Sequence, residues 1–133
     1  MNQLDLSMHQ SAEITVACEQ TVDGAALLGF SGSIEHRNPG TFLDPLLADL
    51  HAQMVKGRIS ALTADFSGLK FLNSSGIKSL LMWVMWVRDM PARDRYTMEF
   101  VYSNDILWQY ASFHSISLLA RGAVTITERS SAP

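Results

Sequence analysis

One stretch decides the fold of this 133-residue chain: Asp65-Phe66-Ser67-Gly68-Leu69-Lys70-Phe71-Leu72-Asn73-Ser74-Ser75-Gly76-Ile77. The apolar run Ile59–Phe66 that enters it is typical of a strand, and the run Ile77–Val87 that leaves it is typical of a helix. Two hydroxyl residues and a glycine therefore stand where a strand gives way to a helix. The first N–H groups of a helix have no partner inside the helix, and the helix dipole makes this end locally positive. A serine at this position can cap the helix, or it can carry a phosphate group that the dipole tolerates.

This stretch resembles the signature of STAS domains, the bacterial anti-sigma-factor antagonists. In that family a strand ends in Asp-Leu-Ser or a similar sequence, and Asp-Ser-Ser/Thr-Gly-Leu opens the next helix. The second hydroxyl of the family motif is the phosphorylation site, and it corresponds to Ser75. The segment Phe30-Ser31-Gly32-Ser33-Ile34-Glu35 also resembles the family's strand end before the first helix. The chain departs from the pattern at Asn73, which replaces the usual acid with an amide that can cap and turn the chain but brings no charge.

The hydrophobic pattern predicts an α/β fold with the order ββαβαβαβ. Alternating strands and helices favour a mixed, mainly parallel sheet covered by helices. The resemblance implies a single STAS-like domain over residues 13–129, with the helices mostly on one side of the sheet. We expect residues 1–12 to form a flexible or short-strand N-terminus and residues 130–133 to form a tail. Strands are predicted near 14–19, 25–34, 59–66, 96–102 and 124–127, and helices near 43–54, from the Ser74/Ser75 junction to about 88, and from 105.

The composition excludes several classes of function. Hydrophobic residues make up 47% of the chain, and the formal net charge is −3, so a packed core is expected and a disordered chain is not. The lysines and arginines are scattered, which argues against a nucleic-acid partner. The longest apolar run, Leu80–Val87, is far shorter than the roughly 20 residues that a membrane helix needs. Because this run is short and the N-terminus lacks a signal-peptide pattern, we expect a cytoplasmic protein without membrane insertion.

We expect no catalytic residue, no metal site and no cofactor. The four histidines lie far apart in the sequence and lack the spacing of metal ligands. No nucleophile-elbow motif and no glycine-rich phosphate loop is present. The single Cys18 cannot form an internal disulfide, and its place in a predicted strand favours a small buried side chain over a reactive thiol.

The two serines leave two interpretations open. Ser-Ser-Gly before a helix often only caps the helix and turns the chain. The match of the surrounding sequence favours a regulatory site, with Ser75 as the phosphorylated residue and Ser74 as the fallback, which otherwise caps or supports the turn.

Four further residues are predicted to support this site. Asp65 at the strand end would orient the serine hydroxyl or simply finish the strand. Asn73 would turn the chain, and Gly76 would let another protein approach the backbone closely. Lys78, in the first turn, would pair with a phosphate group or remain solvated.

The helix after the serines is apolar on all sides. Its predicted core face is formed by Ile77, Leu80, Leu81 and Val84. Met82, Trp83 and Trp86 fall on the other side, where they would form an interaction patch beside Ser75 or be buried by neighbouring helices. Self-association is the main alternative use of this patch. His36, in the loop after the second strand, is predicted to join the partner surface.

The resemblance implies a function as well as a fold. It implies a regulatory module that binds a serine kinase of the anti-sigma type and a counteracting phosphatase, and that has no catalytic activity of its own. The alternative is a STAS fold without phosphorylation that acts as a scaffold, a homodimer or a sensor of a small ligand. Asn73 and the patch of Trp83 and Trp86 motivate this alternative.

Overall fold

The computed structural model describes residues 9–10, 14–34 and 37–129. These residues form an α/β fold whose elements follow the predicted order ββαβαβαβ after one additional short strand. The elements are β1 (His9–Gln10), β2 (Ile14–Gln20), β3 (Ala26–Ile34), α1 (Gly40–Lys56), β4 (Ala61–Leu72), α2 (Ser74–Arg88), the 3-10 helix η1 (Ala92–Asp94), β5 (Thr97–Tyr102), α3 (Leu107–Leu119) and β6 (Val124–Glu128).

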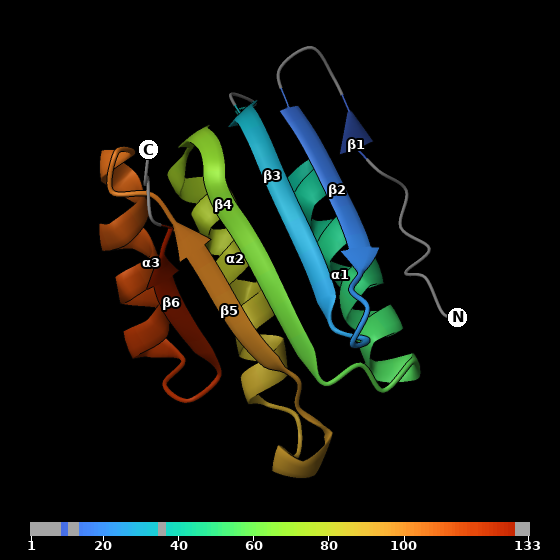
Figure 1. Cartoon of the computed structure of the whole chain (residues 1–133). Coiled ribbons are helices and arrows are strands. Elements are labelled where there is room, and N and C mark those ends of the chain that lie inside the picture. The colour runs from blue at the N-terminus through green and yellow to red at the C-terminus, as the bar shows by residue number, and fades with distance from the viewer. Residues whose placement is uncertain (1–8, 11–13, 35–36, 130–133) are drawn as a thin grey trace.

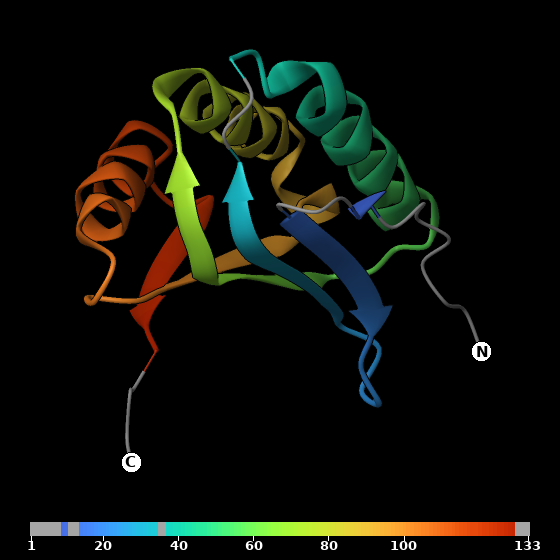
Figure 2. The same cartoon turned by 90° about the horizontal axis from the view of Figure 1, so that it is seen from above.

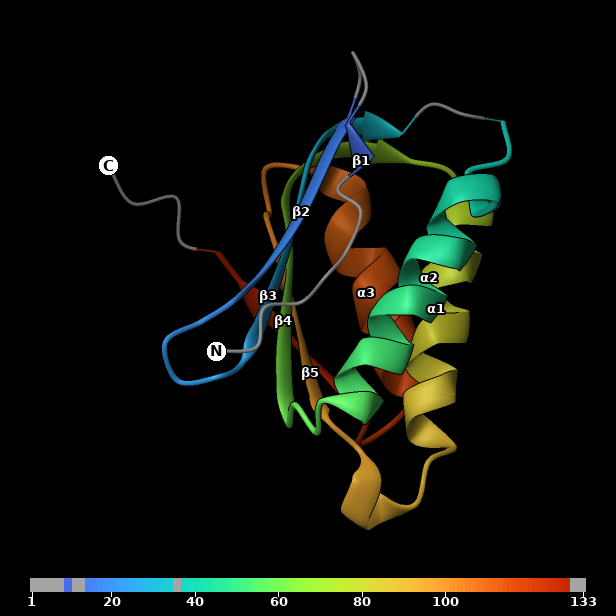
Figure 3. The ribbon, with the colours of Figure 1, turned by 90° about the vertical axis from the view of Figure 1, so that its right-hand side faces the viewer.

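The strands form one sheet in which their spatial order is their order in the chain, β1-β2-β3-β4-β5-β6. β1, β2 and β3 pair in antiparallel fashion, and β3, β4, β5 and β6 pair in parallel fashion. Each parallel connection contains a helix, and the described α-helices all cover the same face of the sheet (Figures 1 and 2). The side view shows this two-layer arrangement (Figure 3). The predicted mixed, mainly parallel sheet with helices on one side is therefore confirmed.

The core lies between the sheet and the helices. Alternate residues of the central strand β4 are buried there because successive side chains of a strand point to opposite faces. Phe66 occupies the middle of the core, where its ring stacks on Phe30 at a centroid distance of 4.8 Å. It also contacts Phe100 of β5 and Phe113 of α3 at 5.0 and 4.8 Å. The sheet and α3 thus share one aromatic cluster.

β4 continues to Leu72, six residues beyond its predicted end at Phe66. On one side it pairs with β3 along its length, with two register shifts that place extra residues in β4. On the other side β5 pairs with β4 only as far as Asp65, which lies opposite Val101. The second half of β4 therefore needs another source of hydrogen bonds on this side.

Two side chains of α3 supply these hydrogen bonds. The fully buried Gln109 donates from Nε2 to the carbonyls of Phe66 and Leu69, at 2.6 and 2.7 Å. Its Oε1 accepts from the backbone N–H of Ser103 at 2.8 Å. Trp108 donates from Nε1 to the carbonyl of Lys70 at 2.8 Å. Because buried carbonyls without partners are costly, these side chains allow β4 to extend past β5.

The first helix begins earlier than its apolar spacing indicates, and it ends before Gly57 in a turn with an unusual residue. α1 begins at Gly40, before the predicted start near Leu43, and Pro45 lies within it. At its end the residue with left-handed backbone is Arg58, with φ of 52°, rather than the preceding glycine. The N–H of Ile59 bonds to the carbonyl of Met54 at 3.0 Å, which closes the helix in a Schellman-type turn. An arginine thus occupies the backbone conformation that glycine normally takes.

Candidate functional site

The N-terminus of α2 is capped by Asn73. This residue has extended backbone, and its Oδ1 accepts a hydrogen bond from the N–H of Gly76 at 3.0 Å. Its Nδ2 donates to the carbonyl of Arg37 at 3.4 Å, which ties the start of α2 to the segment before α1. The amide therefore does the capping, and the expected capping role of Ser74 is wrong.

Ser74 and Ser75 are the first two residues of α2, and both are exposed. Neither hydroxyl makes a hydrogen bond to any residue that the structure describes, whereas the carbonyl of Ser75 accepts a bond from the Ser79 hydroxyl at 3.4 Å. The first turn contains no acidic residue. Lys78 is exposed three residues after Ser75, where two side chains are neighbours on a helix surface. The two hydroxyls are thus accessible at the positive end of the helix dipole.

Gly76 is buried against the chain itself. A Cβ at this position would overlap Cδ1 of Leu72 and would lie 2.7 Å from its Cγ and 3.2 Å from Cγ of Pro39. The glycine therefore allows the first turn of α2 to pack on the end of β4. The prediction that Gly76 offers its backbone to another protein is wrong, because Leu72 and Pro39 already cover it.

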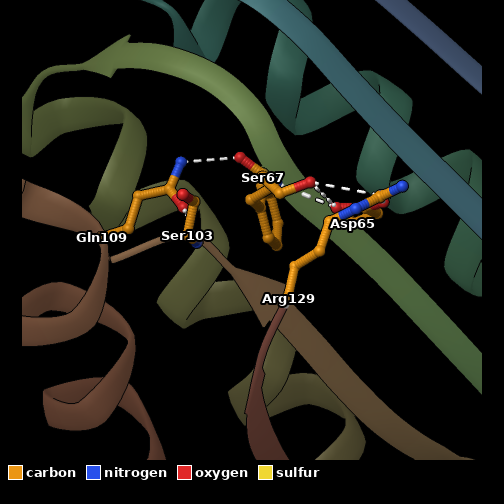
Figure 4. A network of polar contacts seen from close by, with 6 residues as sticks. Asp65, Ser67, Ser103, Gln109 and Arg129 are labelled. Carbon is orange, nitrogen blue, oxygen red and sulfur yellow. Dashed lines mark hydrogen bonds and ion pairs between the residues drawn. The ribbon is translucent and has the colours of Figure 1, made fainter. Parts of the chain in front are cut away.

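Asp65 is far from the serines. Its side chain accepts hydrogen bonds from the N–H and the hydroxyl of Ser67, at 2.9 and 2.6 Å, and forms an ion pair with Arg129 (Figure 4). Leu72 follows it by seven positions along β4, which corresponds to about 20 Å at the usual rise of a strand. The predicted orientation of the serine hydroxyl by Asp65 is therefore wrong, because β4 does not end where the pattern indicated.

The predicted patch on the outer side of α2 is only partly exposed. Trp83 is fully buried, and its Nε1 donates to the Tyr96 hydroxyl at 3.1 Å. Trp86 is half-buried beside His51, at a ring distance of 5.8 Å, and Met82 is 42% exposed. The prediction that Trp83 belongs to a surface patch is wrong, because a hydrogen-bond partner in the core satisfies its indole. The predicted interface residue His36 lies outside the described residues.

The group around Trp83 is structural and neutral. The Tyr96 hydroxyl also lies 2.7 Å from Nδ1 of His51. Burial raises the pKa of Tyr96 and lowers the pKa of His51. Both side chains are therefore mainly uncharged near neutral pH, as expected for groups that hold α1, α2 and the start of β5 together.

Two exposed apolar side chains at the edge of the sheet where α2 begins were not predicted from the sequence. Phe71 is exposed two residues before Asn73, and Leu107 is exposed at the start of α3. Parallel strands place the carboxyl ends of β4 and β5, and hence the starts of α2 and α3, at the same edge of the sheet (Figure 1). The exposure of Phe71 follows from a register shift in β4, which the alternation of residue types does not reveal.

Clusters of metal-ligating side chains and membrane-spanning helices are both absent from the part of the chain that the structure describes. No group of three or more His, Cys, Asp or Glu side chains that could hold a metal ion is found in residues 9–10, 14–34 and 37–129. Among the helices of these ranges, none has the length and hydrophobicity needed to span a bilayer.

No protein-family model matches the sequence, and no curated protein is significantly similar to it. An anti-sigma factor antagonist from Mycobacterium paratuberculosis has a similar structure, with a TM-score of 0.59 at 18% identity over 88% of this chain and 90% of that chain. An uncharacterized protein of the DUF3478 family with a SpoIIAA-like fold, from Shewanella loihica, has a TM-score of 0.53 at 14% identity over 92% and 93%. An anti-sigma-factor antagonist STAS domain from Rhodobacter sphaeroides aligns over 68% of this chain and 88% of that chain, at 17% identity and a TM-score of 0.48. The fold is therefore the SpoIIAA-like fold of STAS domains, as the signature at residues 65–77 predicted.

Proposed function

We propose that this chain is a regulatory protein-binding module that a partner serine kinase switches by phosphorylating Ser75. One observation carries the proposal: the Ser75 hydroxyl is exposed in the first turn of α2 and is not used to cap that helix, because Asn73 caps it. The residue is thus accessible to another protein, and its modification would remove no hydrogen bond that its hydroxyl makes to the described residues.

Phosphorylation of Ser75 would affect the binding of a partner much more than the stability of the fold. Phosphorylation adds about −1.5 to −2 charges at pH 7. The helix dipole and the neighbouring Lys78 favour this charge at the start of α2, so the fold remains stable. A partner that covers the neutral serine would instead have to desolvate a phosphate group. A penalty of about 3 kcal/mol weakens binding roughly 10²-fold, which is sufficient for a switch.

The surroundings of Ser75 suit a protein partner. The apolar side chain of Phe71 is exposed two residues before Asn73, which caps the start of α2. While Ser75 is unmodified, the first turn of α2 carries no negative charge. The similarity to an anti-sigma factor antagonist supports a partner of the anti-sigma type, with the kinase supplying ATP and a phosphatase reversing the modification.

The alternative of a scaffold without phosphorylation has lost part of its support. It depended on Asn73 and on an exposed pair of tryptophans. Asn73 caps the helix as an acid would, although it carries no charge. Trp83 is buried. We therefore place phosphorylation of Ser75 first.

The first test is intact-mass analysis after incubation with ATP and the serine kinase of the anti-sigma type encoded nearest in the genome. We expect wild type and the matched control Ser74→Ala to gain one phosphoryl group and Ser75→Ala to gain none. If no protein is modified while the same kinase modifies another substrate, the proposed phosphorylation is wrong. Modification lost only in Ser74→Ala would move the site to the fallback residue.

The second test isolates the charge. Ser75→Asp and Ser75→Asn have side chains of almost the same size, so a difference between them reports charge rather than bulk. We expect Ser75→Asp to bind the kinase partner at least 10-fold more weakly than Ser75→Asn, measured by titration calorimetry. Equal affinities would contradict the charge switch.

A further inference from the structure

The outer face of α3 is apolar and has no covering element among the described residues. The helix contains no charged residue from Leu107 to Leu119. Its inner face buries Gln109, Phe113 and Ile116. The opposite face carries Leu107, Ala111, His114 and Leu118, of which Leu107 is 89% and Leu118 is 53% exposed. A surface helix normally presents charged or polar residues on this side.

The four residues of this outer face, which we call the α3 stripe, have the spacing of a helix–helix contact. Leu107, Ala111, His114 and Leu118 follow one another at intervals of four, three and four residues. This is the a/d pattern of a coiled-coil seam. α3 lies at the edge of the helical layer with α2 on one side only (Figure 2), so a second helix has free access to the stripe. The pattern therefore indicates packing against another helix.

We propose that the α3 stripe binds the α3 stripe of a second copy of this chain, with the two helices antiparallel about a two-fold axis. Residues at equal distances from a point between Ser112 and Phe113 then face each other. Leu107 meets Leu118 of the second copy, and the small Ala111 meets the large His114. The alternation of small and large side chains across the axis lets the two helices interdigitate.

The charge of the stripe and the order of its rings also suit a second copy. The Tyr110 and His114 rings are stacked at 5.2 Å and 12°, so they are already ordered before binding. A surface without charged residues meets its own copy without like-charge repulsion. These features favour a second copy over a partner of different sequence.

The proposed contact is small. A helix of 13 residues is about 20 Å long, so this contact buries less than a standard interface of about 800 Å² per partner. We therefore expect dimerisation in the micromolar range or weaker.

Sedimentation equilibrium of the full chain, from about 1 µM to 1 mM, tests the dimer. Leu118→Glu and Leu107→Glu should raise the dissociation constant at least 10-fold, because each places two carboxylates in the seam. Val55→Glu, at an exposed position of α1, is the matched control and should dimerise like wild type. Circular dichroism checks that all variants are folded.

The proposal is overturned if wild type remains monomeric at 1 mM, or if Leu118→Glu and Leu107→Glu dimerise like Val55→Glu. A monomeric chain that loses binding to another protein in Leu118→Glu would assign the stripe to that protein and would also overturn it.

Disulfide crosslinking tests the orientation. In a Cys18→Ala background, a mixture of Ala111→Cys and His114→Cys proteins should crosslink, because these positions face each other in the antiparallel pair. Either protein alone should crosslink at least 10-fold less. Crosslinking of Ala111→Cys with itself, but not with His114→Cys, would overturn the antiparallel arrangement.

Discussion

Replacing Gly76 by alanine probes why the switch segment contains a glycine. The added Cβ would overlap Cδ1 of Leu72 and approach its Cγ at 2.7 Å. Leu72 is 4% exposed at the end of β4, so its side chain has little room to move away. Overpacking of this kind costs about 1–3 kcal/mol. Because the new Cβ overlaps an atom of a buried leucine, the cost lies in the upper half of this range, at about 2–3 kcal/mol. Alanine recovers about 0.5–1 kcal/mol in a helix relative to glycine, so we expect Gly76→Ala to lower the free energy of unfolding by about 1–2.5 kcal/mol.

Urea unfolding followed by circular dichroism measures this loss. Ser75→Ala, a substitution at an exposed position of the same turn, is the matched control and should change the free energy of unfolding by no more than about 0.5 kcal/mol. Leu72→Ala removes the atoms that the new Cβ meets. The double variant with Gly76→Ala should therefore be more stable than the sum of the single effects by about 1 kcal/mol or more.

A Gly76→Ala protein as stable as wild type, or two substitutions whose effects simply add, would refute this reasoning. The glycine would then not be required by internal packing. Its backbone would instead be available to a binding partner, as the sequence pattern alone indicated.

Three further predictions concern other parts of the fold. Gln109→Leu removes the hydrogen-bond partners of two β4 carbonyls and of the Ser103 N–H. It should lower the free energy of unfolding, measured in urea, by about 2–4 kcal/mol. A loss below about 1 kcal/mol would contradict this role of Gln109. Arg58 has a positive φ, which glycine adopts without strain. Arg58→Gly should therefore raise the free energy of unfolding by about 0.5–1 kcal/mol, whereas Arg58→Ala should not. Equal changes in the two variants would show that the backbone conformation is not the cause. Burial raises the pKa of the Cys18 thiol to about 11, so its thiolate fraction at pH 8 is about 0.1%, against about a quarter for an ordinary thiol. Ellman's reagent should therefore label native protein at least about 100-fold more slowly than urea-unfolded protein, and equal rates would disprove the burial effect.

The sequence predicted the elements whose signals are local. The strand patterns at 14–19 and 124–127 correspond to β2 and β6 within one residue at their ends. The start of α2 was also predicted, because its capping and turn residues stand next to one another in the chain. Apolar spacing is sufficient for the two strands, and neighbouring cap and turn residues are sufficient for the helix start.

The length of β4 could not be predicted in the same way. Ser67 and Gly68 have the character of a turn, yet they lie within the strand. The hydrogen bonds that keep this part extended come from Gln109, about 40 residues later. A pattern that considers neighbouring residues contains no information on this contact.

The prediction of which face of α2 is buried was partly wrong for a related reason. A helix that is apolar on all sides does not show by periodicity which side is buried. The Tyr96 hydroxyl, at the start of the next strand, accepts the indole hydrogen bond that allows Trp83 to enter the core. The partner of Asp65 is similarly remote, since Arg129 follows 64 residues later.

The order of the strands has a consequence for how the chain folds during synthesis. Within the described sheet each strand pairs only with strands next to it in the chain, so a growing chain can add strands in the order in which they are made. The second half of β4 is the exception, because two of its carbonyls have no partner until Gln109 of α3 has been synthesised. A nascent chain that has not yet produced α3 therefore presents an open strand edge, which is the kind of surface that pairs with other chains. The arrival of α3 closes this edge, and β6, which is made last, then pairs with β5.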